Sequence, residues 1–236
     1  MEEAAEALSA VAPAPLAWPT VFDEPHVVER VWGEFAATLP DEDRRVLARA
    51  LAFARARHGS QTRTGSETPY WVHLVRVAME VARWGLATRE LLVAALLHDV
   101  VEDTDATPNE VEAGFGPAVA ECVAWLTCPQ GPEDAVRAHY ERLRQAPDGV
   151  RLLKLADRTD NLRSIQALVM RTGRHRRWAG RYLARTIWQV LPLAAAAPSV
   201  ARVALVTAMA DLAPLVERGE EGSGGGAGGK AGPGVT

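Results

Sequence analysis

Four side chains that can bind a metal ion or move a proton lie close together in the segment AALLHDVVEDT, residues 94–104. They are His98, Asp99, Glu102 and Asp103. Because successive residues of a helix turn by about 100°, a single helix would place all four on less than half of its circumference. The apolar residues before them would hold the other side in a core, so we expect the polar group to face either water or a cleft.

The acidic side chains of this segment lie at the unfavourable end of a helix. Acidic residues are favoured near a helix N-terminus, whereas Asp99, Glu102 and Asp103 follow the apolar run that forms the helix body. A solvated helix end is the ordinary explanation, but it accounts poorly for three carboxylates at the C-terminal end. We therefore expect a compensating positive charge, and a divalent metal ion is the first candidate.

Two further residues can complete a set of metal ligands. His73 lies in TPYWVHL and Asp157 lies in LLKLADRTDNLR. Each has an ordinary alternative, because a lone histidine is more often a core residue and Lys154 or Arg158 can neutralise Asp157. With the His-Asp pair at 98–99 they form a set with nitrogen and oxygen donors and no thiolate. Such a set suits manganese, iron or cobalt better than a structural zinc ion.

The bulk composition is that of an ordinary soluble domain. The chain has 236 residues, of which 48% are hydrophobic and 24% charged, and its net charge is -4. That charge makes nucleic acid an unlikely partner. The acidic N-terminus differs from a signal peptide, and no apolar run approaches the roughly 20 residues of a membrane span, so we expect a cytoplasmic protein without a membrane segment. Cys122 and Cys128 are expected to be small buried residues.

The apolar pattern predicts an all-α domain at residues 23–217, between a flexible leader at 1–22 and a flexible Gly-rich tail at 218–236. Thr68 and Pro69 predict a helix start, and Gly59 predicts a helix end. We expect helices over about 24–38, 41–57, 69–84, 88–103, 107–113, 116–127, 132–145, 149–171, 174–191 and 199–217.

Five segments of the chain together indicate a family. HGSQTR, TPYWVHL, ALLHDVVEDT, FGPAVAECVAWLT and LKLADRTDNLR occur in this order. In these segments the chain resembles the HD-domain hydrolase of the RelA/SpoT alarmone family, particularly its small stand-alone hydrolases, over about residues 44–190. The resemblance implies a single HD-domain helical bundle.

The resemblance also implies a reaction and the residues that perform it. Enzymes of this family use a metal-activated water to cleave the 3′-pyrophosphate of ppGpp and pppGpp, which releases pyrophosphate and GDP or GTP. Glu102 and Asp103 match the pair that orients and activates that water. The positions that match the ligands of its single manganese ion are His73, His98, Asp99 and Asp157.

The contacts to the nucleotide carry over less completely. Arg63 matches an arginine near the guanine base, Asn161 matches an asparagine near the ribose, and Arg163 and Ser164 continue the nucleotide-facing segment. Thr64 and Cys128 stand where the family commonly has lysines. These departures leave open a phosphohydrolase for another nucleotide or NADPH, and a catalytically silent nucleotide-binding regulator remains a further alternative.

Further basic residues lie outside these motifs. A stripe at spacings of three and four is either a solvated helix face or the border of a cleft for a phosphate-rich substrate; its members are Arg174, Arg177, Arg181 and Arg185. His58 is expected to support the loop that carries Arg63 or to cap its helix. The other histidines are expected at the surface; they are His26, His139 and His175. The sequence sets no oligomeric state.

Overall fold

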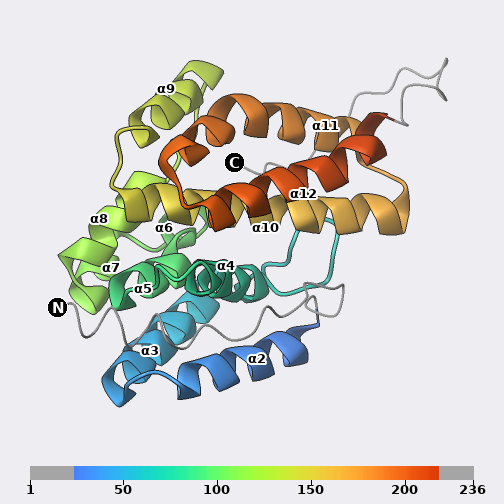
Figure 1. Cartoon of the computed structure of the whole chain (residues 1–236). Coiled ribbons are helices and arrows are strands. Elements are labelled where there is room, and N and C mark those ends of the chain that lie inside the picture. Colours follow the sequence, from blue (N-terminus) through green and yellow to red (C-terminus); the bar gives the residue numbers. More distant parts are fainter. Residues whose placement is uncertain (1–23, 218–236) are drawn as a thin grey trace.

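The computed structural model describes residues 24–217, and within them it confirms the all-α prediction. The predicted leader at 1–22 and tail at 218–236 lie outside these residues. The elements, shown in Figure 1, are α2 Pro25–Ala37, α3 Asp41–His58, α4 Trp71–Arg83, α5 Arg89–Leu97, α6 Val100–Asp103, α7 Pro108–Phe115, α8 Pro117–Leu126, α9 Glu133–Leu143, α10 Asp148–Thr172, α11 Arg176–Arg185, the π-helix η2 Thr186–Val190, the 3-10 helix η3 Leu191–Ala196 and α12 Ser199–Glu217.

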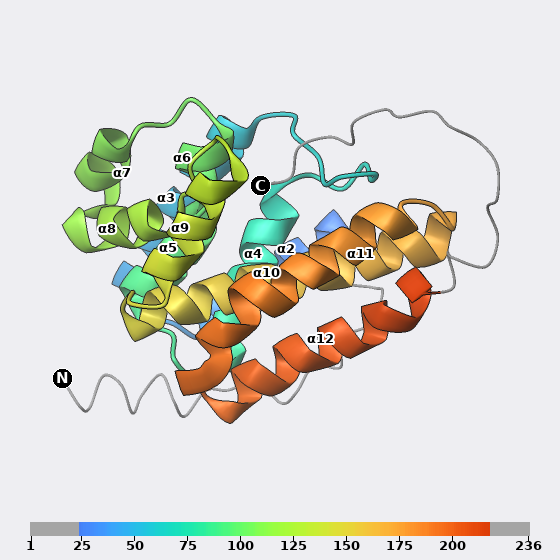
Figure 2. The same ribbon diagram turned by 90° about the horizontal axis from the view of Figure 1, so that it is seen from above.

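Helix α10 is the central element of the bundle. It lies between α4 and α5 on one side and α11 and α12 on the other (Figures 1 and 2). Every residue from Leu152 to Asp160 is buried, so this part of α10 is enclosed on all sides. A charged side chain on such a stretch must be paired, because an isolated buried charge is costly. The fold therefore brings the acidic residues of α10 against partners from neighbouring helices.

The predicted helix at 88–103 is wrong as a single helix. Helix α5 ends at Leu97, and the one-turn helix α6 begins at Val100, with His98 and Asp99 between them. The His98 ring Nδ1 lies 2.9 Å from the Ala95 carbonyl oxygen. Both residues keep right-handed backbone angles, so the break interrupts the helical hydrogen bonds at the His-Asp pair without reversing the chain.

Other predicted boundaries have mixed outcomes. Gly59 ends α3 with a φ of 52°, and its N–H donates to the Arg55 carbonyl oxygen, as expected. The start at Thr68 and Pro69 is wrong, because α4 begins at Trp71 and Pro69 forms an isolated bridge with Thr62. The helix expected over 174–191 is also interrupted, since α11 passes into η2 and then η3.

Helix α12 corrects the expectation about membrane segments. By length and composition alone, Ser199–Val216 is apolar enough to cross a membrane, with a mean hydropathy of 1.6. Its inward face packs in the bundle, where Ala201, Leu205 and Leu212 are fully buried. Core helices of soluble proteins have the same composition, so this helix alone is weak evidence for a membrane.

Candidate metal centre and active site

Two buried histidines present one free nitrogen each to the same point. His73 comes from α4 and His98 from the end of α5, and their ring centres are 5.2 Å apart. The Nδ1 atom of His73 is 2.7 Å from the Asp160 carboxylate, and that of His98 faces the Ala95 carbonyl. Both Nε2 atoms are buried and have no hydrogen-bond partner. Rings fixed through Nδ1 with Nε2 free are typical of metal-ligating histidines.

Two carboxylates face these nitrogens. The Asp99 Oδ2 atom is 3.6 Å from His73 Nε2 and 3.0 Å from His98 Nε2. The Asp157 Oδ1 atom is 3.5 Å and 3.8 Å from the same two nitrogens. The ligand atoms of His73, His98 and Asp99 all lie within 4.8 Å of one another. The donors and orphaned nitrogens fit a divalent cation with nitrogen and oxygen ligands.

The electrostatics of the cluster favour bound positive charge. Burial by itself lowers the pKa of His98, but Asp99 and Asp157 outweigh it and raise that pKa well above 6.5. Burial by itself raises the pKa of Asp157, but Lys154 and the two histidines hold it well below its usual range. The cluster therefore keeps its carboxylates ionised and attracts a cation, and a metal ion would take the place of protons on the histidines.

Glu102 and Asp103 lie beside this cluster on α6. The Glu102 Oε2 atom accepts a 2.6 Å hydrogen bond from the Cys128 backbone N–H. The Tyr70 hydroxyl lies 2.7 Å from Asp99 Oδ2 and 2.8 Å from Asp103 Oδ2. Burial and the nearby Asp99 charge raise the pKa of Asp103 above 3.8, which brings this carboxylate closer to the proton affinity that a general base requires.

Three residues of the site have roles that the sequence did not indicate. Tyr70 joins two carboxylates, and Asp160 orients His73 while it accepts a 2.6 Å hydrogen bond from Arg76 Nε. Lys154, expected only as a partner of Asp157, contacts it at 3.0 Å and also lines the cleft. All three residues lie in the motifs TPYWVHL and KLADRTDN, which the sequence had already singled out. The spacing of Asp157 and Asp160, one helical turn apart, could have indicated that Asp160 also faces the site.

A polar cleft of about 270 Å³ opens over the cluster. Of the predicted nucleotide contacts, Arg63 and Asn161 line it and bond to each other, and Asn161 Nδ2 also donates to Asp157 Oδ1 at 2.5 Å. Ser164 instead accepts a hydrogen bond from Arg76, and Arg163 pairs with Glu80 at 3.2 Å. The structure therefore does not bring Arg163 into the cleft. The complete lining is Gln61, Thr62, Arg63, Thr64, Tyr70, Asp99, Glu102, Asp103, Lys154, Asp157 and Asn161.

The loop that carries Arg63 is held at both sides. His58 stacks on Tyr70 with ring centres 4.4 Å apart and bonds to Gln61, which confirms its predicted supporting role. Gly65 has a φ of 68°, and a Cβ atom there would lie 2.8 Å from Leu168 Cδ1. The positive φ favours glycine, and a larger residue would also have to push the Leu168 side chain aside.

A family model described as an HD domain matches residues 50–195. The chain belongs to the HD domain family. The match extends from α3 to η3 and includes each of the four candidate metal ligands. Membership in this family implies a divalent metal ion, for which His73, His98 and Asp99 are candidate ligands.

This HD domain is also similar to several characterised proteins. MESH1 of Drosophila melanogaster, named guanosine-3′,5′-bis(diphosphate) 3′-pyrophosphohydrolase, is 40% identical over 49% of this chain and 67% of MESH1. SpoT of Escherichia coli K12, named bifunctional (p)ppGpp synthase/hydrolase, is 40% identical over 55% of this chain. The chain spans only 19% of SpoT and 18% of the Aquifex aeolicus 3′-pyrophosphohydrolase. A solved metazoan ortholog of SpoT that hydrolyzes ppGpp has a TM-score of 0.64 and 29% identity, over 77% of this chain and 98% of that one.

In this HD domain the cleft continues towards α11. A hollow of about 30 Å³ shares Arg63 and Asn161 with the cleft and is closed by Trp178 and Tyr182 of α11. Arg177, Arg181 and Arg185 lie on α11, whereas Arg174 precedes the helix, so the predicted stripe on one helix face is wrong at Arg174. On an α-helix, residues 181 and 185 lie within about 60° of Trp178 around the axis. All four arginines of the stripe are exposed.

Residues outside the cluster differ from one another in burial. His26 and His175 are exposed as expected, but His139 is only 4% exposed, so its predicted surface position is wrong. The buried face of α9, which contacts η2, encloses this histidine, and Lys154 of α10 contributes to its electrostatic environment. Cys128 is buried as predicted, whereas Cys122 is half-buried.

Proposed function

We propose that this chain hydrolyses the 3′-pyrophosphate of the guanosine alarmones ppGpp and pppGpp to GDP or GTP and pyrophosphate. The observation that carries the proposal is the position of Glu102 and Asp103, which line the same cleft as Asp99 and Asp157 of the His/His/Asp/Asp cluster. The printed activities of MESH1 and of the metazoan SpoT ortholog support this choice of substrate.

The proposed cofactor is one Mn²⁺ ion. His73, His98, Asp99 and Asp157 would hold it, and Asp160 would keep the His73 ring in place. When bound, a divalent ion makes water more acidic and neutralises charge that develops on a phosphoryl group.

The proposed catalytic groups are the two carboxylates of α6. Asp103 accepts the proton of the attacking water, and Glu102, fixed by the Cys128 N–H, orients that water. The new bond joins the water oxygen to the phosphorus attached at the 3′ position, and the bond from that phosphorus to the 3′ oxygen breaks. The proton that Asp103 received then passes to the leaving 3′ oxygen, which forms the ribose hydroxyl and restores the Asp103 carboxylate. Tyr70 positions Asp103 through its hydroxyl.

The nucleotide would lie between the cluster and α11. Arg63 and Asn161 border both the cleft and the small hollow beside Trp178, so they are placed to contact base and ribose. Ser164 lines only the small hollow, and Arg163, paired with Glu80, is the weakest of the proposed contacts. The exposed stripe of α11 would attract the phosphate chain from this side.

One alternative substrate class is favoured by a specific observation. Thr64 lines the cleft and Cys128 contributes only its backbone N–H to Glu102, so neither position adds a cation for phosphate. Another nucleotide or NADPH is therefore the second candidate. The partner is in either case a small nucleotide, and the cytoplasmic location and the domain limits at 23–217 stay predictions.

The test is release of pyrophosphate and GDP from ppGpp by the purified chain with Mn²⁺. We expect release that is lost with a chelator and in Asp99→Ala, but kept in the matched surface variant Asp134→Ala, whose side chain is 84% exposed. Cleavage of NADPH or another nucleotide instead of ppGpp would move the proposal to the second substrate. Tight binding of ppGpp without turnover would identify a silent regulator.

A further inference from the structure

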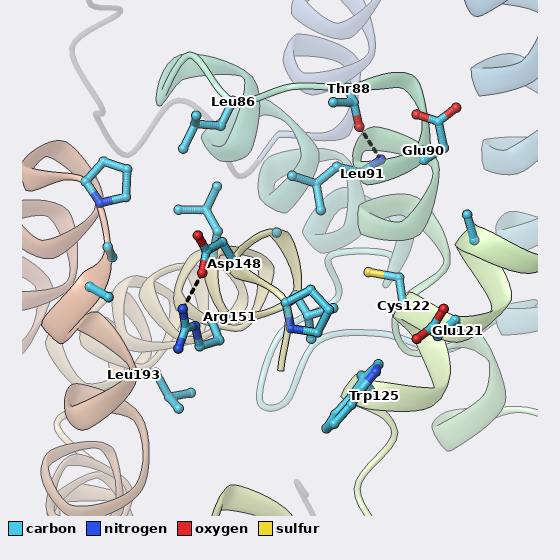
Figure 3. A pocket seen from close by; sticks show the side chains of 18 residues that line it. Leu86, Thr88, Glu90, Leu91, Glu121, Cys122, Trp125, Asp148, Arg151 and Leu193 are labelled. Carbon is cyan, nitrogen blue, oxygen red and sulfur yellow. Dashed lines mark hydrogen bonds and ion pairs between the residues drawn. The ribbon is translucent and has the colours of Figure 1, made fainter. Parts of the chain in front are cut away.

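A second and larger hollow lies on the molecule outside the cleft. It encloses about 650 Å³ between the start of α5, α8, the start of α10 and η3 (Figure 3). Leu86, Leu91, Trp125 and Leu193 give it apolar walls. Hollows of this size commonly take a large apolar group, and none of the residues 24–217 fills it.

The mouth of this hollow is acidic. Glu90, Glu121 and Asp148 are exposed around it, whereas Arg151 is the basic residue of the lining. Asp148 and Arg151 pair with each other, as the dashed line in Figure 3 shows. Within the described part of the chain, Glu90 and Glu121 have no ion-pair partner. The hollow therefore suits an apolar group that is flanked by positive charge.

The same molecule carries a group of this kind. Trp188 on η2 is 76% exposed, which is the largest exposure of any large apolar side chain among residues 24–217, and its neighbour Ile187 is 41% exposed. Arg185 directly precedes η2 and Arg181 lies about one turn earlier on α11, so both lie close to Trp188 along the chain. Both arginines are exposed and have no ion pair within the described chain.

We infer that two copies of this chain form a dimer in which Trp188 of each copy enters the hollow of the other. The indole buries apolar surface against Leu91, Trp125 and Leu193, and an exposed tryptophan is a frequent anchor of protein interfaces. Arg181 and Arg185 then approach Glu90 and Glu121, which gives the contact its orientation.

The position of these two features suits a two-fold axis. Trp188 lies on η2, and η3, which directly follows, contributes Leu193 to the hollow. In an isologous contact each copy supplies both the protruding group and its receptor, as this chain does. The indole and the hollow use none of the residues that line the cleft, so variants of Trp188 and Ala118 test the interface apart from the proposed activity. Arg181 and Arg185 also belong to the stripe that is proposed to attract substrate, so they stay unchanged in these tests.

The first test is the mass of the full chain in solution, by analytical ultracentrifugation over a range of concentrations. We expect a dimer, and Trp188→Glu should raise its Kd by at least about 30-fold for each of the two indoles removed from a hollow. Met170→Glu is the matched control, because Met170 is 66% exposed and lies on α10 outside the hollow, and it should leave the dimer unchanged. Circular dichroism checks that each variant keeps its helices.

A mixing experiment tests the reciprocal geometry. Ala118→Trp fills the hollow from α8 but leaves Trp188 intact, so it should also be a monomer. Mixed with Trp188→Glu, it should form a heterodimer through the one intact contact. A wild-type monomer at about 100 µM, or a Trp188→Glu dimer as tight as wild type, would overturn the inference; the hollow would then be left to a small ligand or another chain segment.

Discussion

Helices α5 and α10 each reach two very different regions. Towards the C-terminal end of α5 and the middle of α10 lies the cleft, where His98 and Asp157 stand among mutually bonded polar side chains. At their N-terminal ends the two helices supply the hollow, where Leu91 and Leu152 form apolar walls and the acidic rim has members without an ion pair in the described chain. The same pair of helices thus carries a closed polar network in one region and an open apolar surface in the other.

From this difference we expect substitutions in the cleft to affect catalysis and substitutions at the hollow to affect association between chains. In the cleft, Asp157 contacts Lys154, Asn161 and both histidines, so each side chain fixes the position of others. At the rim of the hollow, Glu121 is exposed and forms no ion pair in the described chain. Substitutions of one chemical type should therefore have unequal effects in the two regions.

The largest expected effect is the loss of a proposed catalytic carboxylate. Glu102→Gln should lower kcat by about 10²- to 10⁴-fold, because the amide cannot orient the attacking water as a carboxylate does. Metal content measured by elemental analysis should stay near wild type. Glu121→Gln, at the hollow, should keep full kcat. Equal losses in both variants would contradict the division between cleft and hollow.

The second effect is the pH dependence of stability caused by His139. Burial, with Lys154 and Arg142 nearby, lowers the pKa of His139 from 6.5 to about 4. Between pH 6.5 and pH 4, His139 is protonated in the unfolded chain but neutral in the folded chain. The free energy of unfolding therefore has its full value above pH 6.5 and falls as the pH drops towards 4. The loss is at most about 3 kcal/mol, less any screening by water.

Urea unfolding from pH 7 to pH 4 measures this loss. His139→Gln should flatten the acid limb, because glutamine has no proton to gain. His175→Gln, on an exposed histidine, is the matched control and should leave the pH profile as it is in wild type. An unchanged profile in His139→Gln would show that other groups govern acid unfolding.

A smaller effect is expected from the group that orients a metal ligand. Asp160→Asn should weaken Mn²⁺ binding by about 10- to 100-fold, since the amide holds the His73 ring less firmly than the carboxylate. Calorimetric titration of the folded variant measures the affinity. Asp148→Asn, at the hollow end of the same helix, should bind Mn²⁺ like wild type. Equal Mn²⁺ affinities of the two variants would exclude a role for Asp160 in orienting the His73 ligand.

The smallest effect concerns the stripe on α11. Arg177→Glu and Arg181→Glu should each raise KM several-fold and reduce its dependence on salt, because they remove long-range attraction for phosphate. Arg137→Glu, on exposed α9, should change neither quantity. If KM stays constant in both stripe variants, the stripe is only a solvated face.

The sequence was sufficient to predict an all-α fold and to single out residues that the fold then brings together. His73 and Asp157 lie far from His98 in the chain, yet their donor types and apolar surroundings indicated a common site. Their convergence on one point depends on α10 being enclosed by other helices, which periodicity alone cannot specify.

What the sequence could not predict depends on tertiary contacts. The break at His98 accompanies a side-chain bond to Ala95, and the burial of His139 follows the packing of α9 on its neighbours. Arg163 continues the nucleotide-facing segment in the chain, but its partner Glu80 on α4 draws it elsewhere. Such competition between partners is set by positions in space, so local sequence patterns carry little information about it.

The tight approach of Gly65 to Leu168 has a consequence for how this enzyme can change its substrate. The positive φ of Gly65 restricts which residues this turn of the loop accepts, so variation acts most readily through the neighbouring side chains that the loop displays. Thr64, next to the constrained glycine and open to the cleft, is the natural site for such variation. A lysine there would add a cation beside the substrate without re-routing the chain, so substrate preference could evolve at this position on an unchanged scaffold.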